Sequence, residues 1–311
     1  MKLSPLIIGA VTTLSGQTWA WGGFGHITVA YIASNFVSPK TATYFQTLLG
    51  NSTDDYLAGV ATWADSVRYT KWGRFSGPLH YIDANDSPPS YCGIVYERDC
   101  NPSGCIVSAI QNYTSQILDP SLRESSRVIA AKFVIHFVGD IHQPLHNENV
   151  ARGGNGILVT FDKTKFNLHH VWDTSIAEKL VPGGRVARQP YAQAKHLADQ
   201  LSGQIVGGKF NESSRSWLEG MTLADPVATA LQWAVEGNAH VCTTVMPQGP
   251  EAIRDQELGS DTVYLKNALP VIELQLAKAG YRLAAWLDMI AAAAPGNFKT
   301  DDFSLPGGSD L

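Results

Sequence analysis

Histidine and aspartate recur at a spacing of four residues in two places along the chain. His136 and Asp140 form one such pair, and His169 and Asp173 form the other. Residues four apart lie on the same face of a helix, so each pair would present an imidazole beside a carboxylate. Imidazole and carboxylate ligands without thiolate are typical of zinc in hydrolytic sites. Either pair alone would also fit a core helix that carries a few satisfied polar groups.

The chain holds further groups of the same chemistry. Pro144 ends a helix because it lacks an N–H group, so His146 would approach from a new direction. Asp65 lies in an apolar helical pattern, where a carboxylate is uncommon without a partner, although an ion pair with Arg68 would explain it. The candidate metal ligands are Trp21, His26, Asp65, His80, His136, Asp140, His146, His169 and Asp173. Clustered, they could hold two or three ions and so promote an in-line phosphoryl displacement.

The first twenty residues are typical of a secretory signal. Lys2 supplies the positive end, residues 6–14 are apolar, and Ala20 is a small residue suited to cleavage. We therefore expect a secreted protein that begins at Trp21. Its new α-amine could meet the ring of His26, because nearby glycines allow sharp backbone folding, and a metal could capture the neutral amine. The alternative is a frayed terminus.

Four cysteines in a secreted chain indicate two disulfides. The close pair Cys100 and Cys105 could close a small loop, and Cys92 would then reach Cys242. A thiolate metal site is the alternative, but it fits a secreted chain poorly. Possible glycosylation sites of the N-x-S/T type stand at Asn51, Asn85, Asn112 and Asn211.

The charge of the chain limits the ways in which it could bind a polyanion. The net charge is −5, and there is no tract of lysine and arginine. Most nucleic-acid-binding proteins depend on basic patches, so positive charge would have to come from elsewhere, with bound metal ions as the obvious source. No stretch after the signal is long and apolar enough to span a membrane, since 284–294 is short and contains Asp288.

Apolar periodicity predicts one mainly α-helical domain over residues 21–294, followed by a polar tail, 295–311, that we expect to be disordered or processed. The run from Arg127 to Asp140 is nearly continuous apolar surface and predicts a buried helix. Residues 86–104 are loop-like, Pro78–Asp83 is predicted to be extended, and 157–161 is the only good strand pattern. Other predicted helices are Ile27–Phe36, Thr41–Leu49, Tyr56–Tyr69, Val107–Leu118, Tyr191–Val206, Pro226–Ala239 and Val263–Ala293, the last interrupted at Pro270.

Seven motifs together carry a resemblance to a known family. They are WGGFGH, ATWADSVRY, PLHYID, HFVGDIHQPLH, GGNGI, HHVWD and GYRLAAWLD. The chain resembles the fungal zinc-dependent single-strand-specific nucleases of the S1/P1 type, from Trp21 to about Ala292. The resemblance implies a single-domain, mainly α-helical fold of the phospholipase C/P1 nuclease class, with three Zn²⁺ ions in a cleft.

The same resemblance implies a ligand set for each zinc ion. Matched motifs give one ion Asp65, His80, His136 and Asp140, and a neighbouring ion the Trp21 amine and carbonyl, His26 and the shared Asp140. They give a third, more exposed ion His146, His169 and Asp173. The two disulfides implied are Cys92–Cys242 and Cys100–Cys105.

The resemblance also implies catalytic and substrate-binding residues. Asp65 would orient the attacking water, and Arg68 would stabilise charge on the transferring phosphate. Tyr81 would stack on a base, Asp83 would contact the base edge, and Asn155 would contact the substrate or support a ligand. Because stacking needs an unpaired base, it favours single strands. The implied enzyme is a secreted monomeric hydrolase that cleaves single-stranded DNA and RNA to 5′-nucleotides and removes phosphate from 3′-nucleotides.

Two alternatives remain open from the sequence. A phospholipase C-type phosphodiesterase on the same fold would share the zinc site, although Tyr81 and Asp83 favour a base over a lipid headgroup. A secreted zinc-binding protein without catalysis would not need Arg68 beside Asp65. His142 and His170 lie next to ligands but on other faces, so neither is included among the candidates.

Overall fold

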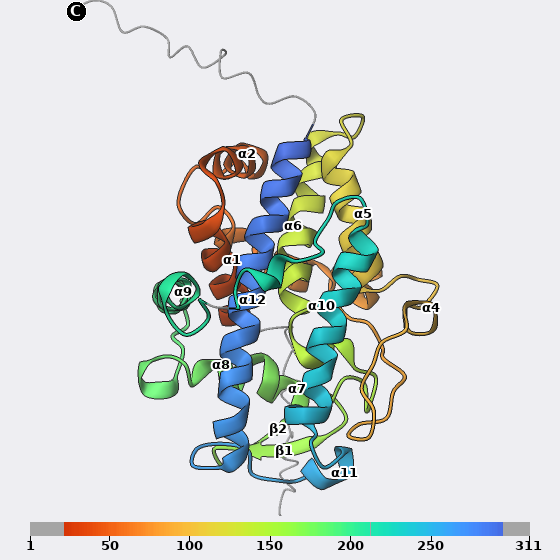
Figure 1. The fold of residues 1–311 in the computed structure, drawn as a ribbon, viewed down its shortest axis with the longest axis vertical. Helices are drawn as coiled ribbons and strands as arrows, with labels where there is room; N and C mark the ends of the chain where they lie inside the picture. The colour runs from red at the N-terminus through yellow and green to blue at the C-terminus, as the bar shows by residue number, and fades with distance from the viewer. Residues whose placement is uncertain (1–21, 212, 295–311) are drawn as a thin grey trace, which may run out of the picture.

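The computed structural model describes residues 22–211 and 213–294, and most of these residues are helical, as the sequence predicted. Its longest helix, α12 (Val263–Ala293), packs against α1 (Gly23–Phe36) and α6 (Glu124–Asp140). Helix α1 also packs against α9 (Tyr191–Gly207). Figure 1 shows α12, α6 and α10 running along the long axis of the molecule.

Two further long helices and a small sheet complete the frame. Helix α5 (Ile106–Leu118) packs against α6 and α10 (Pro226–His240). Strands β1 (Leu158–Phe161) and β2 (Thr164–Asn167) form an antiparallel hairpin in which Leu158 pairs with Asn167. The shorter elements are α2 (Pro39–Leu49), η1 (Ala58–Val60), α3 (Trp63–Val67), η2 (Arg74–His80), α4 (Tyr96–Asp99), η3 (Pro144–Asn147), α7 (Leu168–His170), η4 (Val171–Ser175), α8 (Ile176–Glu178), η5 (Pro182–Gly184), η6 (Ser216–Leu218), η7 (Val241–Val245) and α11 (Pro250–Ile253).

The core is organised around α6, whose residues from Phe133 to Asp140 are all buried. No face of this half of α6 meets solvent, because neighbouring elements cover it on every side, whereas Glu124 and Ser125 in the first turn are exposed. Trp172, Trp233 and Trp286 are also fully enclosed. None of the helices in the described ranges has the length and apolar character needed to cross a membrane.

The helix predicted over Tyr56–Tyr69 is wrong in extent. The structure has a turn of 3₁₀ helix, η1, and then only the short α3. The carbonyl of Ala61 accepts a hydrogen bond from His136 Nδ1 at 2.7 Å. The Ala61 carbonyl therefore bonds to a side chain of α6 and not to a backbone N–H of a continuous helix. This contact joins distant residues, so the local sequence pattern could not predict it.

Other predicted boundaries also differ from the structure. Helix α1 begins at Gly23 rather than at Ile27, and the predicted loop 86–104 contains the short helix α4. Helix α12 continues through Pro270, which is exposed, so the carbonyl that loses its hydrogen bond to the missing N–H can be hydrated. Part of the predicted extended segment, up to His80, is 3₁₀ helix in η2. The glycine-rich start does not bend sharply after Gly22, because α1 already begins at Gly23. Strand β2 carries no alternating apolar pattern and was not predicted.

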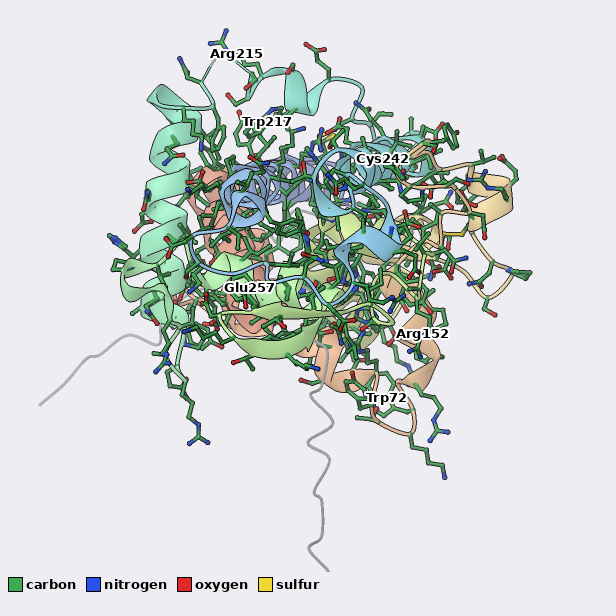
Figure 2. All side chains as sticks on the ribbon, turned by 90° about the horizontal axis from the view of Figure 1, so that it is seen from below. Trp72, Arg152, Arg215, Trp217, Cys242 and Glu257 are labelled. Carbon is green, nitrogen blue, oxygen red and sulfur yellow. A yellow bond between two sulfur atoms is a disulfide. The ribbon has the colours of Figure 1, made fainter. Side chains whose placement is uncertain are left out.

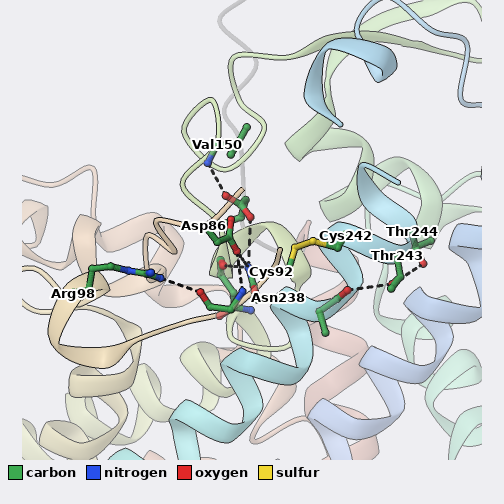
Figure 3. The surroundings of a disulfide bond; sticks show 12 residues. Asp86, Cys92, Arg98, Val150, Asn238, Cys242, Thr243 and Thr244 are labelled. Carbon is green, nitrogen blue, oxygen red and sulfur yellow. Dashed lines mark hydrogen bonds between the residues drawn. A yellow bond between two sulfur atoms is a disulfide. The ribbon is translucent and has the colours of Figure 1, made fainter. Parts of the chain in front are cut away.

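Both predicted disulfides are present. Cys92–Cys242 joins the loop before α4 to η7 across 150 residues, and Cys100–Cys105 closes a loop that spans 5 residues. Beside the long-range disulfide, Asn238 on α10 donates hydrogen bonds from Nδ2 to Asp86 Oδ2 (3.1 Å) and to the carbonyl of Asn147 (2.9 Å). Figure 3 shows Asn238 and Asp86 next to this disulfide. The loop is therefore fixed covalently to η7 and by hydrogen bonds to α10.

Candidate metal centre and cleft

Four elements bring one group of predicted ligands together. Asp140 ends α6, and its Oδ2 lies 2.9 Å from His80 Nδ1 and 3.2 Å from His136 Nε2. Its Oδ1 lies 3.1 Å from His26 Nε2 on α1. Asp65 on α3 completes the group, with Oδ1 3.7 Å from His136 Nε2. All five side chains are buried.

A second group lies where η3 meets α7 and η4. His169 Nε2 is 3.1 Å from Asp173 Oδ2, and His146 Nε2 is 3.7 Å from Asp173 Oδ1. Asp173 and His146 are buried, whereas the His169 side chain keeps 11% of its surface exposed. This group is therefore the more open of the two.

Three of the histidines have their tautomer fixed by the backbone. His136 Nδ1 meets the carbonyl of Ala61, His146 Nδ1 meets that of His80, and His169 Nδ1 meets that of Gly153, each at 2.7 Å. A carbonyl can only accept, so each Nδ1 carries the hydrogen. Each Nε2 is then left with its lone pair directed at a carboxylate. Such contacts are the usual way in which proteins orient imidazole ligands of metals.

The Nε2 lone pairs of these histidines face carboxylate oxygens, which are also acceptors. A cation is needed between two such groups. Several buried atoms of these two groups have no hydrogen-bond partner within residues 22–211 and 213–294. They are Nε2 of His26, His80, His136 and His146, both oxygens of Asp65, Asp140 Oδ1 and Asp173 Oδ2. Buried polar atoms are rarely left unpaired. Protons or metal ions must lie between them, and the donor set of nitrogen and oxygen fits divalent metals.

The pKa values show where protons would sit without metal. Burial lowers the pKa of His146, but Asp140 and Asp173 outweigh it and raise that pKa to about 9. Burial lowers the pKa of His80 to about 4, against the attraction of Asp140. The pKa of Asp140 is well below its usual range because His136 and His146 outweigh the effect of burial. Protons and metal ions therefore compete for the same atoms.

A strained turn positions His169. Ala151, Arg152, Gly153 and Gly154 all have positive φ, between 50° and 76°. Non-glycine residues adopt this conformation at a cost, so the surrounding structure must impose it. A Cβ added at Gly153 would lie 2.7 Å from the carbonyl oxygen of Leu145. Gly153 thus allows its carbonyl to reach His169 where a side chain would not fit.

A cleft of about 540 Å³ opens beside the second group. It has the size of a small-molecule site. The predicted substrate-binding residues Tyr81, Asp83 and Asn155 line it together with Arg68. Its remaining lining residues are Leu145, His146, Glu148, Asn149, Arg152, Gly153, Asn167 and His169. The structure therefore places the predicted catalytic arginine, the predicted base-binding residues and two of the histidines around one space.

Arg68 connects the buried carboxylates to the cleft. Its Nη2 lies 3.6 Å from Asp65 Oδ1 and donates a hydrogen bond to the Tyr69 hydroxyl at 3.1 Å. The ion pair considered from the sequence is thus present, but Asp65 also approaches His136. Arg68 is partly exposed, so its guanidinium can reach a bound anion.

Several residues of the site were not predicted from the sequence. Gln143 is buried and donates from Nε2 to Asp173 Oδ1, while its Oε1 accepts from the Leu145 N–H. Its place inside the HFVGDIHQPLH motif was the available signal. Arg152 and Glu148 also line the cleft. Burial raises the pKa of Glu148 to about 8, and Asp86 adds to this effect.

Two histidines that were left out of the predicted ligand set, His142 and His170, make other contacts. His142 donates from Nδ1 to the carbonyl of Val138 and accepts from Arg282 at Nε2 (3.1 Å). Burial and Arg282 hold its pKa well below the usual range, so it is neutral. His170 stacks on Phe166. Trp21, predicted as a ligand through its amine, lies outside the described residues.

Comparisons with known proteins agree with the geometry. The model of the S1/P1 Nuclease family matches residues 21–292. The chain is 47% identical to Nuclease S1 of Aspergillus oryzae, over 92% of this chain and 97% of that protein. It is 44% identical to Nuclease P1 of Penicillium citrinum, over 87% and 97%, and 33% identical to Endonuclease 4 of Arabidopsis thaliana, over 92% and 94%. On these matches, the chain belongs to the S1/P1 nuclease family.

Proposed function

We propose that this nuclease is a secreted, zinc-dependent endonuclease. It hydrolyses phosphodiester bonds of single-stranded DNA and RNA to 5′-nucleotides and removes phosphate from 3′-nucleotides. The observation that carries the proposal is the pair of buried imidazole–carboxylate groups, with acceptors facing acceptors, beside a cleft that also holds Arg68, Tyr81 and Asp83. Membership of the nuclease family supports the class of reaction.

Zinc is the metal that the donor set favours, because nitrogen and carboxylate oxygen without thiolate suit hydrolytic zinc. We propose three ions, held by the two ligand groups together with the Trp21 amine. When bound, the metals would activate water and stabilise charge on the phosphate. Three ions would bring six positive charges, so the cleft would remain positive in a protein of net charge −5.

The protein's own residues would orient and stabilise the reacting groups. The carboxylate of Asp65 would orient the attacking water through an acceptor oxygen. Arg68, 3.6 Å from Asp65 Oδ1, would donate to the equatorial oxygens of the phosphate as their charge grows. The backbone contacts at Ala61, His80 and Gly153 would keep the imidazoles from turning during the reaction.

The cleft would select unpaired bases. Tyr81 is partly exposed and would stack on a base, and Asp83 would accept a hydrogen bond from the base edge. Burial raises the pKa of Asp83, and nearby Asp99 adds to this effect. Asn155 donates to the carbonyl of Arg152 at 2.9 Å, so it would also support the strained turn. A base in a duplex cannot enter such a site without unstacking.

Processing and localisation belong to the same proposal. We expect residues 1–20 to be removed as a signal, residues 21–294 to form the nuclease domain, and residues 295–311 to be the polar tail predicted from the sequence. The signal and the tail both lie outside the described residues. Asn85, Asn112 and Asn211 are exposed and Asn51 is partly exposed, so each could be glycosylated. Mass measurement of the secreted protein would identify both the first residue and the occupied glycan sites.

The test is hydrolysis of single-stranded DNA by protein that begins at Trp21, before and after chelation, with metal content measured on the same sample. We expect chelator-sensitive release of 5′-nucleotides and about three zinc ions per chain. Phosphatidylcholine serves as the comparison substrate. Zinc without cleavage of DNA but with cleavage of the lipid would replace the proposal by a phospholipase C activity, and a protein without zinc would refute it.

A further inference from the structure

The segment from Arg68 to Phe75 alternates cations and aromatic residues, and the mechanism above uses only its first residue. Its sequence is RYTKWGRF, and residues 66–82 contain no acidic residue in a chain whose net charge is −5. Three of its aromatic side chains are exposed: Tyr69 by 56%, Trp72 by 54% and Phe75 by 53%. Large aromatic side chains that gather on a surface mark a binding site more often than a chance exposure.

The exposed rings form a connected group. Trp72 lies 6.1 Å from Trp63 and 6.5 Å from Phe75, measured between ring centroids. Phe75 and Trp63 in turn pack on Phe133 of α6, at 6.4 Å and 5.2 Å. The inner edge of the group is therefore anchored in the core while the outer faces remain open. Figure 2 shows Trp72 on a part of the chain that projects from the molecule.

The backbone under these rings is fixed. Thr70 Oγ1 donates to the carbonyl of Val67 at 2.7 Å and accepts from the N–H of Gly73 at 3.0 Å. Ser76 Oγ donates to the carbonyl of Gly73 at 2.8 Å. Gly73 is buried and approaches Val67 so closely that no side chain would fit there. A rigid support lowers the entropy lost when a ligand binds.

Positive charge accompanies the rings. Lys71 and Arg74 are exposed, and neither forms an ion pair within the part of the chain that the structure describes. Lys132 Nζ lies 5.2 Å from the centre of the Trp63 ring. Phosphate groups of a strand and the faces of its bases need these two kinds of side chain, cations and aromatic rings, in one place.

The group is continuous with the cleft. Arg68 lines the cleft, and its guanidinium carbon lies 5.1 Å from the centre of the Tyr69 ring. From Tyr69 the chain runs through Lys71 and Trp72 to Phe75. A strand whose scissile phosphate lies at Arg68 would therefore meet these residues next.

We propose that Tyr69, Lys71, Trp72, Arg74 and Phe75 form a track that holds single-stranded nucleic acid outside the cleft. The proposal rests on the nuclease function proposed above and extends it, because the track would make affinity depend on strand length. Bases would stack on Trp72 and Phe75, and the phosphates between them would contact Lys71 and Arg74. Stacking is tolerant of sequence, so the track would add affinity without base preference.

The test is equilibrium binding to the metal-loaded protein, measured by fluorescence anisotropy. The probes are phosphorothioate-linked oligothymidylates of about three and about twenty nucleotides. W72A/F75A should raise the Kd of the long probe about tenfold, the scale expected for loss of base–aromatic stacking, with a much smaller change for the short probe. The single variant Trp72→Phe keeps an aromatic face for stacking, so it should bind the long probe nearly as tightly as the unaltered protein. Tyr91→Ala is the matched control, since Tyr91 is also 56% exposed.

The contribution of Lys71 and Arg74 is measured separately, by the salt dependence of binding. Each phosphate contact contributes about −0.7 to the slope of log K against log salt for single strands, so K71A/R74A should reduce the slope by about 1.4. R188A/R215A removes the same charge from exposed positions elsewhere and should leave the slope unchanged. Figure 2 places Arg215 at the opposite side of that view from Trp72.

The outcomes separate this proposal from the proposed function. If the protein cleaves single-stranded DNA but W72A/F75A weakens both probes equally or neither, the track is wrong and the nuclease function stands. If W72A/F75A instead changes the sedimentation mass and not the Kd, the surface is an interface with a second copy. If the long probe alone weakens and the slope falls in K71A/R74A, the track is established even for a protein that fails to cleave DNA.

Discussion

Each of His136, His146 and His169 has one ring nitrogen fixed by a backbone carbonyl, and this determines what the other nitrogen can do. The Nε2 lone pairs point at Asp140 and Asp173, which are also acceptors. Only a cation reconciles such neighbours. A buried acceptor that has neither a proton nor a metal ion beside it would cost about 1–3 kcal/mol of stability. Loss of the metals must therefore be accompanied by uptake of protons.

Arg68→Ala tests the predicted role of the cleft arginine. We expect kcat for single-stranded DNA to fall by about 10²–10³, because a donor to the developing phosphate charge is lost. Arg68→Lys should recover part of the rate, since it restores the charge but not the two-pronged geometry. Zinc content should not change, because the guanidinium supplies no ligand atom. Arg215→Ala, at an exposed position, is the control, and an unaltered rate in Arg68→Ala would remove this residue from the mechanism.

The raised pKa of Glu148 predicts that the stability of the folded protein depends on pH. Its folded pKa is raised to about 8, so between the ordinary value and pH 8 the folded protein holds a proton that the unfolded protein releases. The sign follows from linkage: stability is fully present at low pH and is lost as pH rises through the folded pKa. Between pH 6 and pH 8 the loss should approach about 1 kcal/mol per pH unit.

Glu148→Gln mimics the protonated side chain and should remove this loss. The measurement is the free energy of urea unfolding of both proteins at several pH values, with a chelator present so that no bound metal alters the pKa of Glu148. The two curves should diverge as pH rises, with the variant the more stable at pH 9. Parallel curves would show that Glu148 is already ionised in the folded protein.

At the scale of elements, short irregular segments do most of the positioning and the long helices hold them in place. Helix α6 supplies His136 and Asp140, but η3, α7, η4 and the turn around Gly153 supply the second ligand group. Residues 151–154 adopt a left-handed backbone, which glycine tolerates at 153 and 154 but which Ala151 and Arg152 adopt only at a cost. Such strain persists only where neighbouring structure imposes it, and here it places a carbonyl against His169.

Gly153→Ala tests that turn. The added Cβ would collide with the carbonyl of Leu145, and alanine disfavours the positive φ. We expect the turn to shift, His169 to lose its fixed tautomer and the second ligand group to lose its metal. Metal analysis should show about one zinc ion fewer per chain, while the buried group around Asp140 keeps its ions. Gly203→Ala on α9 is the control, since nothing lies within 4 Å of a Cβ there. Full metal content in Gly153→Ala would contradict the role given to the turn.

At the scale of the whole molecule, an acidic protein has to bind an acidic polymer. Its net charge is −5, yet residues 66–82, which include Arg68 beside the cleft, contain cations and no acidic residue. Arg68 and Arg152 line the cleft, and Lys71 and Arg74 extend from it over the proposed track. The bound metals would add to this field. Positive charge concentrated at one place could therefore bind nucleic acid although the net charge of the protein is negative.

The two disulfides should contribute unequally to stability. Cross-links that close longer loops restrict the unfolded chain more, so Cys92–Cys242, across 150 residues, should contribute more than Cys100–Cys105, across 5. The chain-entropy estimates are about 5 and about 2 kcal/mol. C92S/C242S should therefore lower the melting temperature by several degrees more than C100S/C105S. Calorimetry of the two variants with zinc in excess provides the comparison, and equal shifts would contradict the loop-length argument.

Much of the fold was predictable because its signals are local. Continuous apolar residues marked α6 as buried, and periodicity placed α5, α9, α10 and α12 within a residue or two of their ends. The spacing of His136 with Asp140, and of His169 with Asp173, put each pair on one helical face. These relations involve residues close in sequence, so the sequence by itself determined them.

The tertiary structure decided the rest, because the deciding contacts join distant residues. The Ala61 carbonyl is 75 residues from His136, and the His80 carbonyl is 66 residues from His146. The first of these contacts interrupts the helix predicted over 56–69 and, like the second, fixes an imidazole. The buried environment of Glu148 and the exposure of Trp72 likewise depend on neighbours that packing supplies. A sequence pattern states which groups are available, whereas burial and hydrogen-bond partners exist only once the chain has folded.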